Sequence, residues 1–293
     1  MNLRTATTTA KASAPFLANT REWQLDALNE LIQTGGALTD SVKDRGIWTS
    51  ALAKAFSKPI QVEPAEIPTD AERGTWELPG LVAFKRGPLY GLVFYDVAGS
   101  TLNLKGKFGG GPTVFWSEGT GNSICSMRNA SGGTVKTADD ITHSCVFGSK
   151  SDGSLFYTGN EHPTLTWLEQ DKKFEIKSDI ANPQGSLSWV YDIGEEATTV
   201  TVTFTSGDVQ EAFVNLPVYL KYDGAVTDDS VNGRYVYEVD GNKIEITWDS
   251  SVTAQYAKGL IPGGKSKTVD CIRLPIQSGK PVSFTVKAIP SNE

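Results

Sequence analysis

Two histidines, His143 and His162, are the only imidazoles in the chain and the first candidates for chemistry. Imidazole is the usual general base and metal ligand near neutral pH. His143 lies in DDITHSCVFG, where a strand would place it on one face with Ile141 and Cys145. It is therefore either a hydrogen-bonded residue of a half-buried sheet or a proton carrier. His162 lies in the loop-like TGNEHPT, and no spacing requires the two histidines to converge, so we expect no metal site.

A second candidate site lies in the segment TVFWSEGTGNSICSMRNASGG, which places Trp116, Arg128 and Asn129 around turns. Proteins bind sugars by aromatic stacking together with a few fixed polar groups. The guanidinium of Arg128 can pair with the carboxylate of a uronic acid. The segment thus predicts a carbohydrate ligand. The alternative is that Trp116 is a core aromatic residue and Arg128 a solvated strand residue.

Motifs of nucleotide and zinc-protease chemistry are absent from the sequence. The glycine-rich FGGGP at residues 108–112 is followed by strand-like sequence instead of a helix, so it predicts a mobile loop and no phosphate site. Cys125, Cys145 and Cys271 form no CxxC pair, so they are either three buried thiols or one disulfide and a free thiol. We expect no cofactor.

The 293 residues carry a net charge of -7 and no block of Lys and Arg, which argues against nucleic acid or an anionic membrane as a partner. No apolar run approaches the ~20 residues of a membrane helix. The first twenty residues lack the apolar region of a secretory signal peptide. The protein is thus either cytosolic or a mature or truncated piece of an exported protein.

Helical periodicity is confined to the first fifth of the chain. Apolar residues at spacings of three and four predict helices near residues 20–34 and 41–57. Residues 59–74 are proline-rich and predict a linker between a helical segment, 1–58, and an all-β region, 75–293.

Beyond the linker the period becomes two. About sixteen short segments rich in Val, Ile, Thr and aromatic residues predict one large antiparallel β-sandwich, with two smaller sandwiches split near residue 180 as the alternative. Asp240-Gly241 or Gly241-Asn242 marks a hairpin turn. The predicted fold class is mainly β, with two α-helices before the sandwich.

This order of elements resembles the C-terminal part of heparinase II/III-like polysaccharide lyases, which join an α/α toroid to a large, supersandwich-like β-sandwich. WQLDALNELI and IWTSALAKAF resemble the last toroid helices, and PTVFWSEGTGNSICSMRN resembles the strand pair that opens the sandwich. SLSWVYDIGEEATTVTVTFTSGDVQEAFVNLPVYL resembles its later run. The resemblance implies β-elimination on a uronic-acid-containing polysaccharide, in which a base removes the C5 proton and the C4–O bond breaks.

The resemblance also implies site residues and partners. Because Tyr and His usually share the acid and base duties in the family, His143 and Tyr157 are the expected proton carriers of the sandwich. Most of the family's catalytic groups lie on the toroid, so we expect this chain to be inactive alone and part of a larger periplasmic or extracellular enzyme. Its partner would be acidic polysaccharide. The apolar stripes of residues 20–57 predict contact with a missing toroid domain or self-association. The alternative is a non-catalytic carbohydrate-binding or structural module.

Overall fold

The computed structural model describes residues 74–78, 80–95, 109–117, 119–126, 135–159, 162–218, 225–229, 232–260 and 269–291. All of them belong to one compact unit, Asp70–Glu293. The predicted helices near residues 20–34 and 41–57 lie outside this part, so they stay predictions, as do the domain boundaries. No helix in the described ranges is long and apolar enough to cross a membrane.

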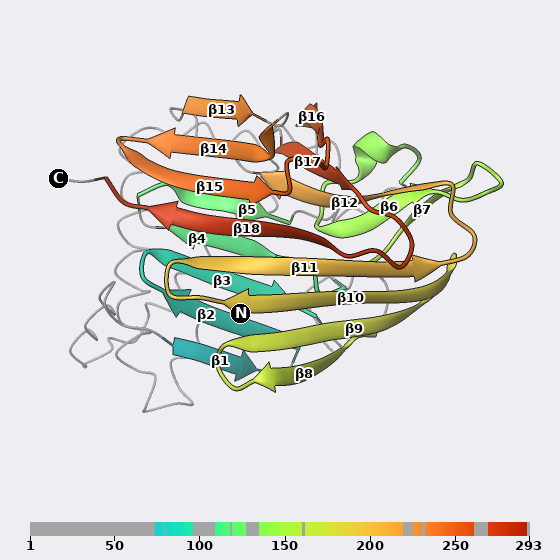
Figure 1. The fold of residues 1–293 in the computed structure, drawn as a ribbon, viewed down its shortest axis with the longest axis horizontal. Helices are drawn as coiled ribbons and strands as arrows, with labels where there is room; N and C mark the ends of the chain where they lie inside the picture. Colours follow the sequence, from blue (N-terminus) through green and yellow to red (C-terminus); the bar gives the residue numbers. More distant parts are fainter. Residues whose placement is uncertain are drawn as a thin grey trace, which may run out of the picture. The chain divides into compact units, whose positions relative to one another are not determined.

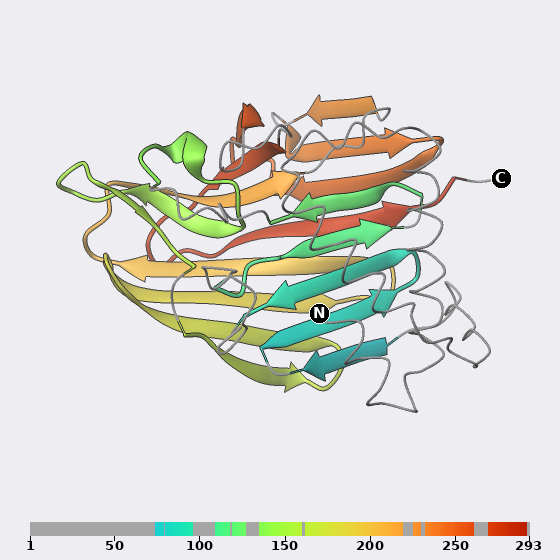
Figure 2. The same ribbon diagram turned by 180° about the vertical axis from the view of Figure 1, so that it is seen from behind.

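The strands form two antiparallel sheets, which face each other in Figures 1 and 2. Sheet A has ten strands: β1 (Gly74–Leu78), β2 (Leu81–Arg86), β3 (Leu89–Phe94), β4 (Val114–Ser117), β5 (Gly121–Cys125), β6 (Cys145–Ser149), β7 (Leu155–Tyr157), β12 (Glu211–Val218), β16 (Gln255–Leu260) and β17 (Val269–Pro275). Sheet B has eight: β8 (Thr164–Glu169), β9 (Lys173–Ala181), β10 (Gln184–Ile193), β11 (Ala197–Ser206), β13 (Ala225–Asp229), β14 (Arg234–Val239), β15 (Asn242–Trp248) and β18 (Val282–Ile289). The 3-10 helix η2 (Ala138–Asp140) precedes β6.

Alternating side chains fill the space between the sheets. On β10, Trp189 and Tyr191 are buried while Ser188 and Val190 face outward, as the period of two requires. Phe156 of β7 stacks on Phe204 of β11 with ring centroids 5.7 Å apart, which joins the two sheets directly. Each fully buried large apolar side chain contributes roughly 1.5–3 kcal/mol. The inter-sheet core is therefore the main source of stability.

The predicted sandwich is confirmed, and it is a single one. Sheet A takes strands from both sides of residue 180, because β5 and β6 pair with β12, which in turn pairs with β17. This excludes two sandwiches split at that point. The hairpin prediction is also confirmed: Asp240 and Gly241 have φ angles of 49° and 79° and join β14 to β15. Two consecutive positive φ angles are typical of a type I′ turn.

One irregularity of sheet A positions the candidate site. β12 pairs with β17 along one edge, whereas its other edge is shared by two strands. β6 pairs with Glu211–Asn215, and β5 pairs only at Val218. The chain that leads into β6 therefore lies near the point where two strands meet the same edge of β12.

Candidate functional site

His143 lies in a bend just before β6, so its predicted place on a strand is wrong: β6 begins two residues later, at Cys145. The side chain is 2% exposed. Its Nε2 lies 3.2 Å from the carbonyl oxygen of Thr158. Because a carbonyl can only accept, Nε2 must carry the hydrogen, and in the neutral ring the lone pair is on Nδ1.

The structure brings His143 and Tyr157 together. Their rings meet edge to face, with centroids 5.8 Å apart and planes at 81°. Tyr157 is half-buried on β7 and lines an open groove of about 590 Å³. His162, Asp179 and Asn182 line the same groove. Tyr157 therefore contacts one histidine of the chain, His143, and lines a groove together with the other, His162.

The other sequence-predicted residues are not joined to this pair. Trp116 lies on the outer face of sheet A, since its neighbour Phe115 points into the core, so it is not an inter-sheet core residue. Its ring contacts Tyr90 at 4.8 Å between centroids, and the Lys85 ammonium lies 4.9 Å from the Tyr90 ring. Arg128 and Asn129 lie outside the described residues, so their predicted roles stay untested.

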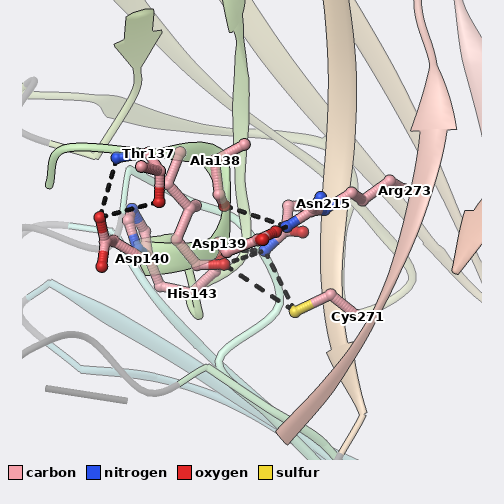
Figure 3. Close-up of polar contacts among 9 residues, drawn as sticks. Thr137, Ala138, Asp139, Asp140, His143, Asn215, Cys271 and Arg273 are labelled. Carbon is pink, nitrogen blue, oxygen red and sulfur yellow. Dashed lines mark hydrogen bonds and ion pairs between the residues drawn. The ribbon is translucent and has the colours of Figure 1, made fainter. Parts of the chain in front are cut away.

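Residues 135–144, which we call the cover segment, lie on the outer face of sheet A over β6, β12 and β17. Two polar side chains from the sheet hold it (Figure 3). The Asn215 Nδ2 donates to the carbonyl oxygens of His143 at 2.9 Å and Ile141 at 3.3 Å. Nη2 of Arg273 donates to the carbonyl oxygen of Ala138 at 3.0 Å and to Oδ1 of Asp139 at 3.0 Å.

A small apolar cluster packs beneath the cover segment. Phe147 of β6 and Phe213 of β12 stack with centroids 5.6 Å apart, and Ile141 and Cys145 complete the buried set. The Arg273 guanidinium lies 5.2 Å from the Phe147 ring. Apolar packing and the hydrogen bonds from Asn215 and Arg273 thus both hold the cover segment.

The turn before His143 is closed by a carboxylate. Oδ2 of Asp140 accepts hydrogen bonds from the backbone N–H of Lys136 at 2.9 Å and from the N–H and hydroxyl of Thr137 at 2.8 Å and 3.0 Å. These donors favour the ionised form, so they lower the pKa of Asp140, the Lys136 N–H contributing most.

On the other side of His143, Ser144 ties the cover segment to two neighbours. Its N–H donates to the Ser126 hydroxyl at 2.9 Å, and its own hydroxyl donates to the Pro112 carbonyl at 2.6 Å. Gly111 packs so closely that a Cβ there would lie 2.9 Å from Ser144. Gly109 to Pro112 are buried, so this part of the glycine-rich stretch is packed structure and not the mobile loop that we expected.

The cysteines are free, so the disulfide alternative is wrong. Cys145 and Cys271 are buried and Cys125 is half-buried. Burial raises the pKa of Cys271 to about 12, which keeps it a thiol at neutral pH and unsuited to nucleophilic attack. Within the described ranges, no three His, Cys, Asp or Glu residues are grouped so that they could hold a metal ion.

The sequence-based site omitted Asn215 and Arg273, and also Asp179 and Asn182 of the groove. Asn215 did leave a signal, because it is a lone amide within the apolar run AFVNLPV. A polar residue at a buried strand position needs a specific partner. The groove residues left none, since Asp and Asn are ordinary in a strand end and a turn.

No family model matches this chain, and no curated protein matches it in sequence. Among solved structures it is similar to the heparan sulfate lyase HepC from Pedobacter heparinus, with a TM-score of 0.54 and 10% identity over 93% of this chain and 42% of the lyase. A heparinase III matches with a TM-score of 0.56 and 10% identity, over 83% of this chain and 40% of the heparinase. A further heparinase III, the BT4657 gene product, matches with a TM-score of 0.52 and 10% identity, over 84% of this chain and 40% of that protein.

This chain therefore spans about two fifths of the length of these lyases. At such low identity the likeness shows the fold alone. The predicted resemblance to the β-sandwich part of heparinase-type lyases is confirmed at that level.

Proposed function

We propose that this chain is the β-sandwich part of a polysaccharide lyase-like protein that acts on uronic-acid-containing polysaccharide by β-elimination, and that alone it turns over little or nothing. The observation that carries the proposal is the contact between His143 and Tyr157 beside a groove, on a fold similar to that of a heparan sulfate lyase. The reaction needs a base for the C5 proton, an acid for the leaving oxygen, and a group that neutralises the carboxylate.

Tyr157 is the proposed catalytic residue, because it lines the groove whereas His143 is almost fully buried. A phenol hydroxyl can both donate and accept a proton. His143 acts through Tyr157: the edge contact of its ring fixes the orientation of the phenol. In this proposal His143 is a positioning residue.

Neutralising the uronate carboxylate requires a cation from beyond the groove walls. The groove lining includes no Lys or Arg among the described residues, and the exposed Asp179 carboxylate repels an anion. We assign the role to Arg128. In sequence it follows Ser126 by two residues, and Ser126 bonds the residue next to His143. Asn129 and Trp116 are the proposed polar and stacking contacts. Because this set is incomplete, low turnover of the chain alone is the expected behaviour.

The test compares Tyr157→Phe with Tyr90→Phe, a matched change on the same sheet. Lyase activity is followed by the absorbance of the unsaturated uronate product from alginate, hyaluronan and heparan sulfate. The assay uses this chain and also the protein as its gene encodes it. In the protein as its gene encodes it, we expect Tyr157→Phe to lower the rate about 10²–10⁴-fold, the usual size of acid–base catalysis. The chain alone should give little or no product with or without the change. Tyr90→Phe should leave the rate unchanged.

An undiminished rate in Tyr157→Phe contradicts the catalytic role. Retention of the chain on immobilised heparan sulfate, with no product from either form of the protein, would instead support the carbohydrate-binding module.

A further inference from the structure

We propose that Asn215 and Arg273 are positioning residues that hold the cover segment on sheet A and thereby keep His143 against Tyr157. The catalytic consequence rests on the proposed function, whereas the positioning itself is a property of the fold.

Asn215 is at the centre of the arrangement. It pairs in register with Cys145 of β6 on one side and with Arg273 of β17 on the other, and it is fully buried. Because the carbonyls of Ile141 and His143 can only accept, the amino group of the amide must face them. Its Oδ1 then has no partner among the described residues, which is costly for a buried acceptor. An apolar side chain would remove that cost, so the benefit of the amide lies in what its Nδ2 binds: the two carbonyls and, as a weaker acceptor, the Cys271 sulfur at 3.6 Å.

Arg273 holds the segment at a second point. Its Nη2 reaches the carbonyl of Ala138, five residues before His143. Asp139 is 70% exposed, so the ion pair adds little on its own. The half-buried Ala138 carbonyl and the Phe147 ring fix the guanidinium instead. Together, Asn215 and Arg273 bind both ends of residues 138–143 (Figure 3).

His143 is thereby fixed at its backbone and at its ring. Asn215 binds its carbonyl, and the Thr158 carbonyl accepts from its Nε2. Release of the backbone should let the segment open locally and expose the imidazole.

The chain offers an internal reference for this prediction, because its other histidine, His162, is exposed. We would treat the intact folded chain with diethyl pyrocarbonate and measure the acylation of each histidine by mass spectrometry of the peptides that contain it. Asn215→Leu should accelerate the reaction at His143 about tenfold, because two hydrogen bonds that oppose local opening are lost. The rate at His162 should not change. The control is Thr198→Val, which removes a buried hydroxyl of β11 that has no partner in the described part of the chain.

Arg273 supplies a second variant, which tests the proposal if a thermal melt shows that Asn215→Leu does not fold. Arg273→Met should also expose His143, and Arg273→Lys, which keeps a charged donor, should restore part of its protection. Unchanged protection of His143 in folded Asn215→Leu and Arg273→Met overturns the proposal. The measurement contains no polysaccharide, so it stands apart from the lyase assay. Loss of protection without loss of lyase activity would contradict the proposed function and leave the positioning role intact.

Discussion

The two sheets differ in what covers their outer faces. Sheet B presents hydroxyl and charged side chains, such as Thr199 and Thr285, whose hydroxyls lie 2.9 Å apart across β11 and β18. Lys287 and Glu196 form an exposed ion pair on the same face. Over β6, β12 and β17, sheet A instead presents Phe147, Phe213 and two residues that bind a backbone segment.

A sandwich needs only its inner faces to be apolar, and both sheets meet that need. Val146 and Val214 point into the main core, while their neighbours Phe147 and Phe213 point outward into a second, smaller core. This outward cluster of Ile141, Cys145, Phe147 and Phe213 therefore packs against the cover segment and adds nothing to the core between the sheets. An apolar cluster on an otherwise solvated outer face therefore marks the place where a further segment packs on the sandwich.

The largest effect should come from the outward cluster. Phe147→Ala should lower the free energy of unfolding by about 3 kcal/mol, because a buried aromatic ring leaves a cavity and the Arg273 guanidinium loses its ring contact. Thr205→Ala, on the exposed face of sheet B, should change it by less than about 0.5 kcal/mol. Urea denaturation of both variants measures the difference. Equal effects would show that the outward cluster is no core.

A smaller difference in the free energy of unfolding should separate the loss of Arg273 on sheet A from the loss of Lys287 on sheet B. Arg273→Met should cost about 1–2 kcal/mol, since the half-buried Ala138 carbonyl loses a charged donor while Asp139 stays solvated. Lys287→Met on sheet B breaks an exposed, solvent-screened pair and should leave the free energy of unfolding almost unchanged. Both values come from urea denaturation at low and high salt. A salt-sensitive loss in Arg273→Met would mean that its pair with Asp139 is what matters.

The sequence predicts the sandwich well because its signals are local. Alternation of apolar and polar residues marks strands such as β9 to β11, and Asp240-Gly241 marks a turn by its own backbone preference. The pairing of β12 with β5, β6 and β17 joins segments that are far apart in the chain. Alternation states which face is buried but not which strand is the neighbour, so the shared edge of β12 could not be predicted.

The candidate site shows the same limit. The choice of His143 and Tyr157 rested on residue type, and the structure places their rings in contact. The placement of His143 on a strand failed because Asn215 and Arg273 bind the backbone before β6 and favour a bend there. Those bonds are tertiary, so no pattern within DDITHSCVFG contains them.

The smallest expected effect concerns pH and again compares the two faces. The pKa of Asp140 is lowered chiefly by the backbone N–H groups of Lys136 and Thr137, whereas that of Glu196 is lowered chiefly by the Lys287 ammonium. A carboxylate with a lowered pKa stabilises the fold above its unfolded pKa, and this stability is lost as the pH falls through the folded pKa.

Asp140→Asn should therefore melt at a lower temperature than the parent chain at about pH 7, and the gap should narrow as the pH falls below about 3.9, the pKa of an unperturbed Asp. Glu196→Gln should show a smaller gap, and high salt should erase it, because a mobile exposed ammonium is screened whereas backbone donors next to the carboxylate are not. The measurement is the melting temperature of each variant against pH at two salt concentrations. A gap for Asp140→Asn that persists at low pH, or that salt removes, would mean that the backbone donors of the cover segment do not hold its ionised form.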